Sequence, residues 1–224
     1  MDAGINVENV LETLRQYDQD IWPLPLLATM LGLVVLILTL QRSCSAGRFI
    51  CSLLALSWIW IGVEYQGVLL GRHQGLGELA SALFVTQGLL IFWHGVLLGR
   101  LNFSPRAGAT GLWGVVLLAY SLAAYPLLSE LLGRGALAGL SLGLAPGPTT
   151  IFTLGLLLWS EENPPLDLLA IPLFWSLLGC QGAWGLGQWQ DLFMPVAGLI
   201  SAGLILRRRW RRGRDGGEVW QAGS

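Results

Sequence analysis

The sequence predicts an all-α protein of the membrane: a polytopic transmembrane helical bundle of seven membrane segments, with a discontinuous fifth segment and a short N-terminal amphipathic helix. Of the 224 residues, 54% are hydrophobic and only 12% are charged, about half the charge of an ordinary soluble domain. Several runs also approach the length of about 20 apolar residues that crosses a hydrocarbon core. All thirteen basic residues are arginines, and they fall into separate groups, as loops on two sides of a membrane require.

The chain begins with an acidic stretch that is followed by an interfacial motif. In residues 5–20 hydrophobic side chains recur at helical spacing and acidic side chains occupy the other faces, which predicts a surface helix over residues 1–20. Its acidic polar face is the wrong sign for an anchor on anionic lipid. In Ile21-Trp22-Pro23, tryptophan prefers the headgroup layer and proline suits a first helical turn. We therefore expect the bundle to occupy residues 21–206.

Hydropathy divides this bundle into membrane segments. We expect unbroken spans over residues 23–40, 49–70, 79–98, 111–132, 166–184 and 192–206. Basic loops separate the first span from the second and the third from the fourth, and a polar turn, Glu161-Glu162-Asn163-Pro164-Pro165, precedes the sixth. Residues 207–224 are expected to form a disordered basic cytoplasmic tail.

The fifth segment lies around Ala145–Ser160, and its first residues do not favour a membrane-spanning helix. The run Thr149–Trp159 reaches about 16 Å at 1.5 Å per residue, against a core of about 30 Å. Pro146 and Pro148 prevent a regular helix upstream of that run. Proline at the first turn and the hydroxyls of the two following threonines suit a helix that begins inside the membrane. A proline-kinked span, or a short span in a thinned bilayer, remains an equal alternative.

Arginine positions set the expected topology. If the fifth segment crosses the membrane and the C-terminus is cytoplasmic, the N-terminus lies outside. The cytoplasmic side then holds the arginines at 42, 48, 100 and 106 and the six arginines within 207–214, whereas the outer side holds those at 15, 72 and 134. This distribution follows the positive-inside rule, so we expect a multi-pass protein of the inner (plasma) membrane.

Glu64 is the principal candidate for chemistry. A carboxylate about seven residues inside a span lies roughly 10 Å deep and normally faces protein or a water-filled cavity. Because a helix start inside the membrane presents free N–H groups and partial positive charge, we expect Glu64 to face Thr149 and Thr150. There it would cap the helix or flank a substrate, ion or proton site. Otherwise it would snorkel to the outer interface.

Further polar residues complete the candidate site: Tyr65, Gln87, Tyr125 and Thr153. Buried polar side chains in membrane bundles more often join helices than bind ligands. We expect no metal site, because the cysteines form no CxxC pair and the two histidines lie on opposite sides. No nucleophile–base set and no phosphate-binding loop occurs, so we expect no enzyme and no cofactor. The terminal arginines suit anionic lipid better than nucleic acid.

Several motifs together resemble a family of uncharacterised bacterial multi-pass membrane proteins, sometimes labelled permease. The most specific is Pro146-x-Pro148-Thr149-Thr150-Ile151-Phe152-Thr153-x-Gly155. The others are Tyr17 with Ile21-Trp22-Pro23, the group Trp58, Trp60, Gly62 and Tyr65, the pair Phe84 and Gln87, Tyr125-Pro126 and Ile171-Pro172. The resemblance implies a cysteine between the two prolines, where this chain has Gly147. It implies the fold and no established activity.

These observations predict a permease-like carrier of a small solute or ion whose partner is the lipid bilayer. The alternative is a non-transporting membrane scaffold or assembly partner. We expect no binding to nucleic acid, and nothing in the sequence indicates a homo-oligomer. Flux into liposomes separates the two functions.

Overall fold

The computed structural model describes residues 20–41, 43–65, 76–132, 142–186 and 188–221, and this part of the chain is helical apart from its connections and an isolated bridge between Phe103 and Ser160. Four of its helices are long and apolar enough to cross a membrane: Cys44–Glu64, Gly77–Leu97, Gly108–Leu131 and Trp189–Arg212. They indicate a membrane protein, and they confirm the predicted all-helical architecture.

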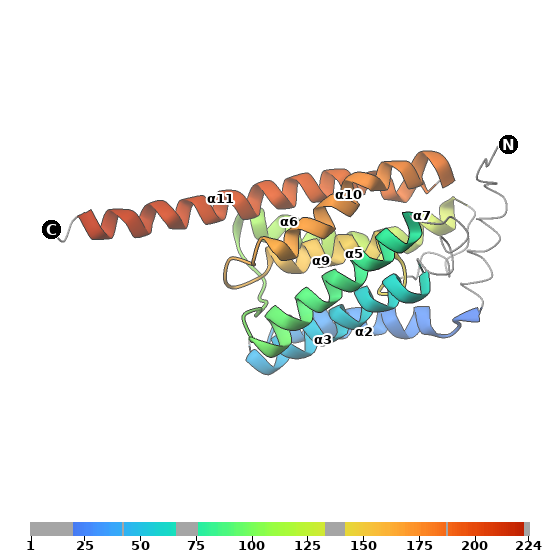
Figure 1. Cartoon of the computed structure of the whole chain (residues 1–224), viewed down its shortest axis with the longest axis horizontal. Helices are drawn as coiled ribbons and strands as arrows, with labels where there is room; N and C mark the ends of the chain where they lie inside the picture. The colour runs from blue at the N-terminus through green and yellow to red at the C-terminus, as the bar shows by residue number, and fades with distance from the viewer. Residues whose placement is uncertain (1–19, 42, 66–75, 133–141, 187, 222–224) are drawn as a thin grey trace.

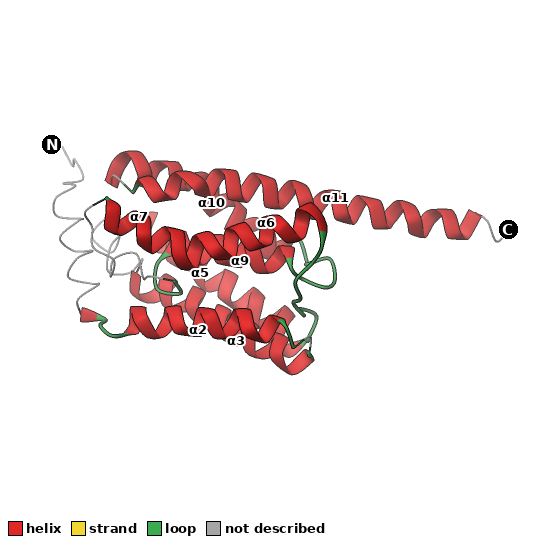
Figure 2. Ribbon diagram, turned by 180° about the vertical axis from the view of Figure 1, so that it is seen from behind, coloured by secondary structure: helices red, strands yellow, loops and turns green. Residues whose placement is uncertain are grey.

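The helices lie lengthwise in the bundle, and the chain passes from one end of the bundle to the other and back (Figures 1 and 2). Three of the longer helices contain a π-helical turn (η1, η2 and η3). The elements are α2 (Leu24–Thr39), α3 (Cys44–Trp60) with η1 (Ile61–Tyr65), α5 (Leu76–Ile91) with η2 (Phe92–Leu97), α6 (Gly108–Ala119) with η3 (Tyr120–Ala124) and α7 (Tyr125–Leu131), α9 (Pro146–Leu158), α10 (Asp167–Leu186), and the 3₁₀ turn η4 (Trp189–Leu192) followed by α11 (Phe193–Gln221).

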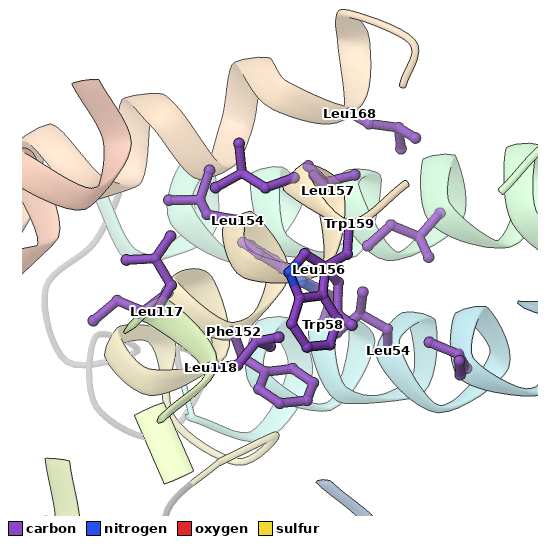
Figure 3. Packing of buried hydrophobic residues seen from close by; sticks show 14 of the residues in the cluster. Leu54, Trp58, Leu117, Leu118, Phe152, Leu154, Leu156, Leu157, Trp159 and Leu168 are labelled. Atoms are coloured by element: carbon purple, nitrogen blue, oxygen red, sulfur yellow. The ribbon is translucent and has the colours of Figure 1, made fainter. Parts of the chain in front are cut away.

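Helix α9 is the centre of the bundle. All of its 13 residues are buried, and it contacts α3, α6, α10, α11 and η3. Figure 3 shows Phe152, Leu154 and Leu156 of α9 packed among side chains from the surrounding helices. A helix that is apolar all round belongs inside protein, which explains why this short segment does not need an amphipathic pattern.

The chain makes a turn immediately before α9. Gly143 has φ +78°, a left-handed conformation that glycine adopts without steric cost. Ala145 is extended and forms the N-cap, and α9 starts at Pro146. The hydroxyl of Thr149 accepts a hydrogen bond from the Gly143 N–H (2.8 Å) and donates one to the Ala145 carbonyl (2.7 Å). Thr149 therefore satisfies the backbone of this turn, whereas its hydroxyl was predicted to accept from free N–H groups of the helix start itself.

Two expectations about the ends of the chain have different outcomes. The surface helix predicted over residues 1–20 falls outside the described residues, except for Asp20. The disordered tail predicted from residue 207 is wrong over most of its length, because α11 continues to Gln221 and extends beyond the other helices (Figure 1). Arginine is a good helix former, and extending an existing helix avoids the cost of nucleation.

Close helix packing in the bundle depends on glycine at several positions, among them Gly88 on α5. A Cβ there would lie 2.6 Å from Cγ1 of Ile59 and 2.8 Å from the Ala55 carbonyl oxygen on α3. Small residues allow backbones in membrane bundles to approach in this way.

We expect the Gly88→Ala substitution to lower the unfolding free energy by about 1–3 kcal/mol, because the added methyl group overpacks the contact. Thermal unfolding of the purified protein measures the effect. Gly203→Ala is the matched control, since a Cβ at Gly203 meets nothing within 4 Å and alanine favours a helix. Equal stability of the two variants would contradict this account of the contact.

Candidate functional site

The acid at the start of α9 is Asp191, and not the predicted Glu64. A Cβ built on Gly147 would lie 2.5 Å from Oδ1 of Asp191 and 2.8 Å from the hydroxyl of Tyr125. The Tyr125 hydroxyl donates a hydrogen bond to that carboxylate oxygen at 2.8 Å. Both side chains are buried, with 7% of Asp191 and 5% of Tyr125 exposed. A carboxylate and a phenol thus meet the second residue of the buried helix.

Asp191 reaches this position because a 3₁₀ turn directly precedes α11. The 3₁₀ turn η4 buries Gln190 and Asp191. The Tyr120 hydroxyl donates a hydrogen bond to the Gln190 carbonyl (2.7 Å), and its ring lies 4.3 Å from that of Phe193. Tyr120 and Tyr125 meet edge to face at 6.3 Å. The tyrosines of η3 and α7 therefore fix the turn that carries the carboxylate.

The prolines of α9 shape the electrostatics of this end. The first residues of any helix have N–H groups without intrahelical partners, but Pro146 and Pro148 have no N–H group. Gly147, between them, retains one. The aligned peptide dipoles give a helix start partial positive charge, which stabilises a nearby carboxylate by about 0.3–1 kcal/mol, and more in buried geometries. The carboxylate of Asp191 occupies this favourable position.

Gly147 allows the close approach. With 2.5 Å between a Cβ and Oδ1, any side chain at this position would displace Asp191 or Tyr125. The resemblance implied a cysteine here, so the packing at this end of α9 is specific to a chain with glycine at this position.

One buried hydroxyl near this end has no partner among the described residues. Thr150 is completely buried, and its Oγ1 makes no hydrogen bond. Residues three apart share a helix face, so Thr150 lies one turn below Gly147 on the side of Asp191. Oε1 of Gln190, which is 5% exposed, is also unpaired in the described part. We call Tyr125, Gly147, Thr150, Gln190 and Asp191 the α9 start site.

The other predicted residues on α9 have structural partners. The Thr153 hydroxyl donates to the Thr149 carbonyl (2.7 Å) and accepts from Nε1 of Trp58 on α3 (3.0 Å). Together with the turn-stabilising role of Thr149, these contacts join α9 to α3 and to the chain before it. The hydroxyls of Thr149 and Thr153 are therefore both engaged in structural contacts.

Three predicted site residues lie elsewhere. Glu64 is in η1 with an exposed side chain and has no hydrogen bond or ion pair within the described residues, as expected for an acid that reaches the interface. The side chain of Tyr65 lies outside the described part. Gln87 is completely buried and its Nε2 donates to the Leu168 carbonyl of α10 (3.0 Å). Gln87 thus joins α5 to α10, as polar side chains in bundles commonly do.

The opposite end of α9 is held by arginines. The Ser160 carbonyl accepts from Nη1 of Arg106 (2.8 Å) and of Arg208 (3.0 Å), and Nη2 of Arg208 donates to the Glu161 carbonyl (2.7 Å). Burial, followed by the charge of Arg212, lowers the pKa of Arg106, and Glu161 opposes this shift. Cations stabilise the free carbonyls of a helix C-terminus. Helix α9 therefore has an acid at its positive end and two arginines at its negative end.

We expect Arg208→Gln to loosen the connection between α9 and α10. The variant loses two charge-assisted hydrogen bonds, each worth about 1.5–3 kcal/mol before solvent exposure reduces it. Hydrogen exchange of the backbone over residues 159–166 should become faster. Arg207→Gln, which removes an exposed arginine, is the control and should leave that exchange unchanged. Unchanged exchange in both variants would show that the arginine does not restrain this connection.

His94 also has a partner that the sequence did not suggest. Its Nε2 lies 2.9 Å from Oδ2 of Asp167, the first residue of α10. This contact ties η2 to α10 at the surface. Within the described residues no group of three metal-ligating side chains occurs.

Sequence reasoning missed Asp191 because it stands at the edge of the seventh predicted span, where an acid is expected to be solvated. A usable signal was present nonetheless. Asp191 is followed by Phe193 and an apolar run, and two tyrosines, Tyr120 and Tyr125, lie in the fourth span. Only the approach of Tyr125 of α7 and Asp191 of η4 to Gly147 of α9 shows that these groups meet.

Comparison with known proteins identifies a family. The sequence model of a family of unknown function, DUF6064, matches residues 7–215. No curated protein and no solved structure matches the chain. The expected resemblance to an uncharacterised family is thereby confirmed.

Proposed function

We propose that this chain, which belongs to the DUF6064 family, is a permease-like carrier of a small solute or ion and that its substrate site is the α9 start site. The observation that supports this proposal is the buried pair of Asp191 and Tyr125 against the start of a short buried helix. Ionisable groups within membrane segments are costly and mark substrate, ion or proton pathways. Helices that start inside the membrane serve such sites in known transporters.

The membrane topology belongs to this proposal. Besides the four long helices, α2, α9 and part of α10 are apolar helices of 10–17 residues, and we assign all seven as membrane segments with α9 as the discontinuous fifth. The C-terminal arginines favour a C-terminus in the cytoplasm and an N-terminus outside the inner (plasma) membrane. Asp191 precedes Arg208 by about 25 Å of helix, which puts its carboxylate about 5 Å inside the outer edge of a core of about 30 Å.

The chemistry of the site suggests the substrate class. A buried carboxylate attracts protons and cations, and the phenol and the two unpaired oxygens add neutral hydrogen-bonding groups. The partial positive charge of the helix start keeps the carboxylate stable while the site is empty. A proton, a small cation, or a small cationic or polar solute fits these groups better than an anion does.

Flux tests the proposal. The purified chain is reconstituted into liposomes that carry a pH-sensitive dye or are loaded with small cations and polar solutes, and flux is compared with that of protein-free liposomes. We expect flux for at least one of these substrates. Glu64→Gln is expected to retain this flux, because the exposed Glu64 lies apart from the α9 start site. No flux for any substrate, with folded protein, would reject the carrier.

A non-transporting scaffold is the second candidate, and one observation favours it. Both ends of α9 are already stabilised by groups of this chain, by Asp191 at its start and by Arg106 and Arg208 at its end. The buried polar groups would then serve only to position α9. Co-purification of a stoichiometric protein partner from native membranes, together with absence of flux, would support this function.

A further inference from the structure

A pocket of about 280 Å³ lies between α2, α3, α9 and the turn before α9. On α2 its lining residues recur every three or four positions and include Leu24, Ala28, Leu31 and Val35, so that they form one continuous face of the helix. We call this pocket the α2 groove. It is separate from the α9 start site, since none of the residues of that site lines it.

The lining of the α2 groove is almost entirely hydrocarbon. Its two hydroxyl groups already have partners within the chain: Ser57 donates to the Leu53 carbonyl (3.0 Å) and Thr149 to the Ala145 carbonyl (2.7 Å). Apolar cavities without polar partners stay dry and take up apolar ligands. The α2 groove therefore suits an apolar ligand and has little to offer a polar one.

The α2 groove opens onto the surface that meets the membrane. Leu27 and Leu56 line it and are nevertheless 53% and 62% exposed. The neighbouring outer face of α2 continues this surface with Met30, Leu33 and Ile37, which are at least half exposed. The rim of the α2 groove is thus continuous with the lipid-facing side of α2.

The length of the α2 groove matches one leaflet. From Leu24 to Val35 it follows α2 for about 16 Å, about half of a hydrocarbon core of about 30 Å. At one end are Trp60, which lines it, and Trp22 just before α2, which is 52% exposed. Tryptophan prefers the headgroup layer. At the other end Val35 and Ile50 close it within the bundle.

We propose that the α2 groove binds one acyl chain of a membrane phospholipid from the leaflet on the side of Trp22 and Trp60. The headgroup lies at the level of these tryptophans, and the chain runs along α2 between α3 and α9. The bound acyl chain contacts Gly143, where a Cβ would lie 2.8 Å from Oγ of Ser57. The acyl chain therefore also packs against the turn that precedes α9.

Photocrosslinking in liposomes tests this proposal with the unmodified protein. A phospholipid with a photoreactive group along one acyl chain is incorporated, and crosslinked peptides are mapped. We expect crosslinks within residues 24–35 and 50–60 well above those on the lipid-facing residues Leu199 and Ile200 of α11. Equal labelling of all lipid-facing helices would overturn the proposal. An α2 groove that has no lipid crosslinks because a second copy of the chain covers it would also overturn the proposal.

Native mass spectrometry of the detergent-solubilised protein provides a second test. We expect the wild type to retain a bound phospholipid. Ala28→Trp, which fills the α2 groove, should lose it, whereas Met30→Trp on the exposed side of the same helix should keep it. Retention by Ala28→Trp, or absence of phospholipid from the wild type, would overturn the proposal. Flux through the α9 start site does not enter either measurement.

Discussion

Asp191→Asn is expected to lower flux in liposomes by about tenfold or more while leaving the bundle folded. A hydrogen bond to a charged group contributes about 1.5–3 kcal/mol, and a loss of 1.4 kcal/mol in binding corresponds to a factor of ten. Asparagine keeps the shape of the side chain, and its carbonyl oxygen can still accept the hydrogen bond that Tyr125 donates at 2.8 Å. The unfolding free energy should therefore change by about 1 kcal/mol or less.

Two further variants separate a role in transport from a role in stability. Tyr125→Phe keeps the carboxylate but removes its donor, and should reduce flux less than Asp191→Asn does. Asp191→Ala leaves the Tyr125 hydroxyl without this acceptor and should destabilise the bundle by about 1–3 kcal/mol. If Asp191→Asn lost stability and flux together, the carboxylate would be a structural cap of α9 and the scaffold would be the better function.

Trp58→Ala is expected to have the largest effect on stability, about 3–5 kcal/mol of unfolding free energy. Trp58 is completely buried on α3. Its ring lies 4.9 Å from that of Phe84 on α5, which in turn meets Trp175 of α10 edge to face at 4.7 Å. Its Nε1 donates to Thr153 of α9. Trp58 thus contacts α5 and α9 directly and α10 through Phe84, and its removal leaves a cavity at this junction.

Thermal unfolding in detergent measures this effect. Trp58→Phe keeps most of the ring packing and loses the hydrogen bond to Thr153, so it should cost only about 1–2 kcal/mol. Trp93→Ala is the matched control, because Trp93 is 54% exposed and should change stability little. A Trp58→Ala variant as stable as Trp93→Ala would show that the contact among α3, α5, α9 and α10 does not hold the bundle together.

The resemblance implies a cysteine at position 147, and the residue at this position affects the α9 start site. With Gly147, the carboxylate of Asp191 and the hydroxyl of Tyr125 approach the helix backbone closely. A thiol at that position would require both groups to withdraw and would itself occupy the start of α9. The chemistry of this position therefore depends on the residue present, and a carboxylate–phenol site is a property of this chain.

Hydropathy and arginine placement, read from the sequence alone, determined the class of protein and the approximate positions of its helices. Long apolar runs have few ways to bury themselves, and Pro146 and Pro148 mark the start of α9 because proline excludes a preceding regular turn. The same reading could not determine which acid meets that start, because the position of an acid along a span, well inside for Glu64 and at the edge for Asp191, does not show which way its side chain points. The rotation of η1 leaves Glu64 exposed, whereas η4 and two tyrosines turn Asp191 inward. Tertiary packing decided this choice, since the direction of a side chain depends on neighbours distant in sequence.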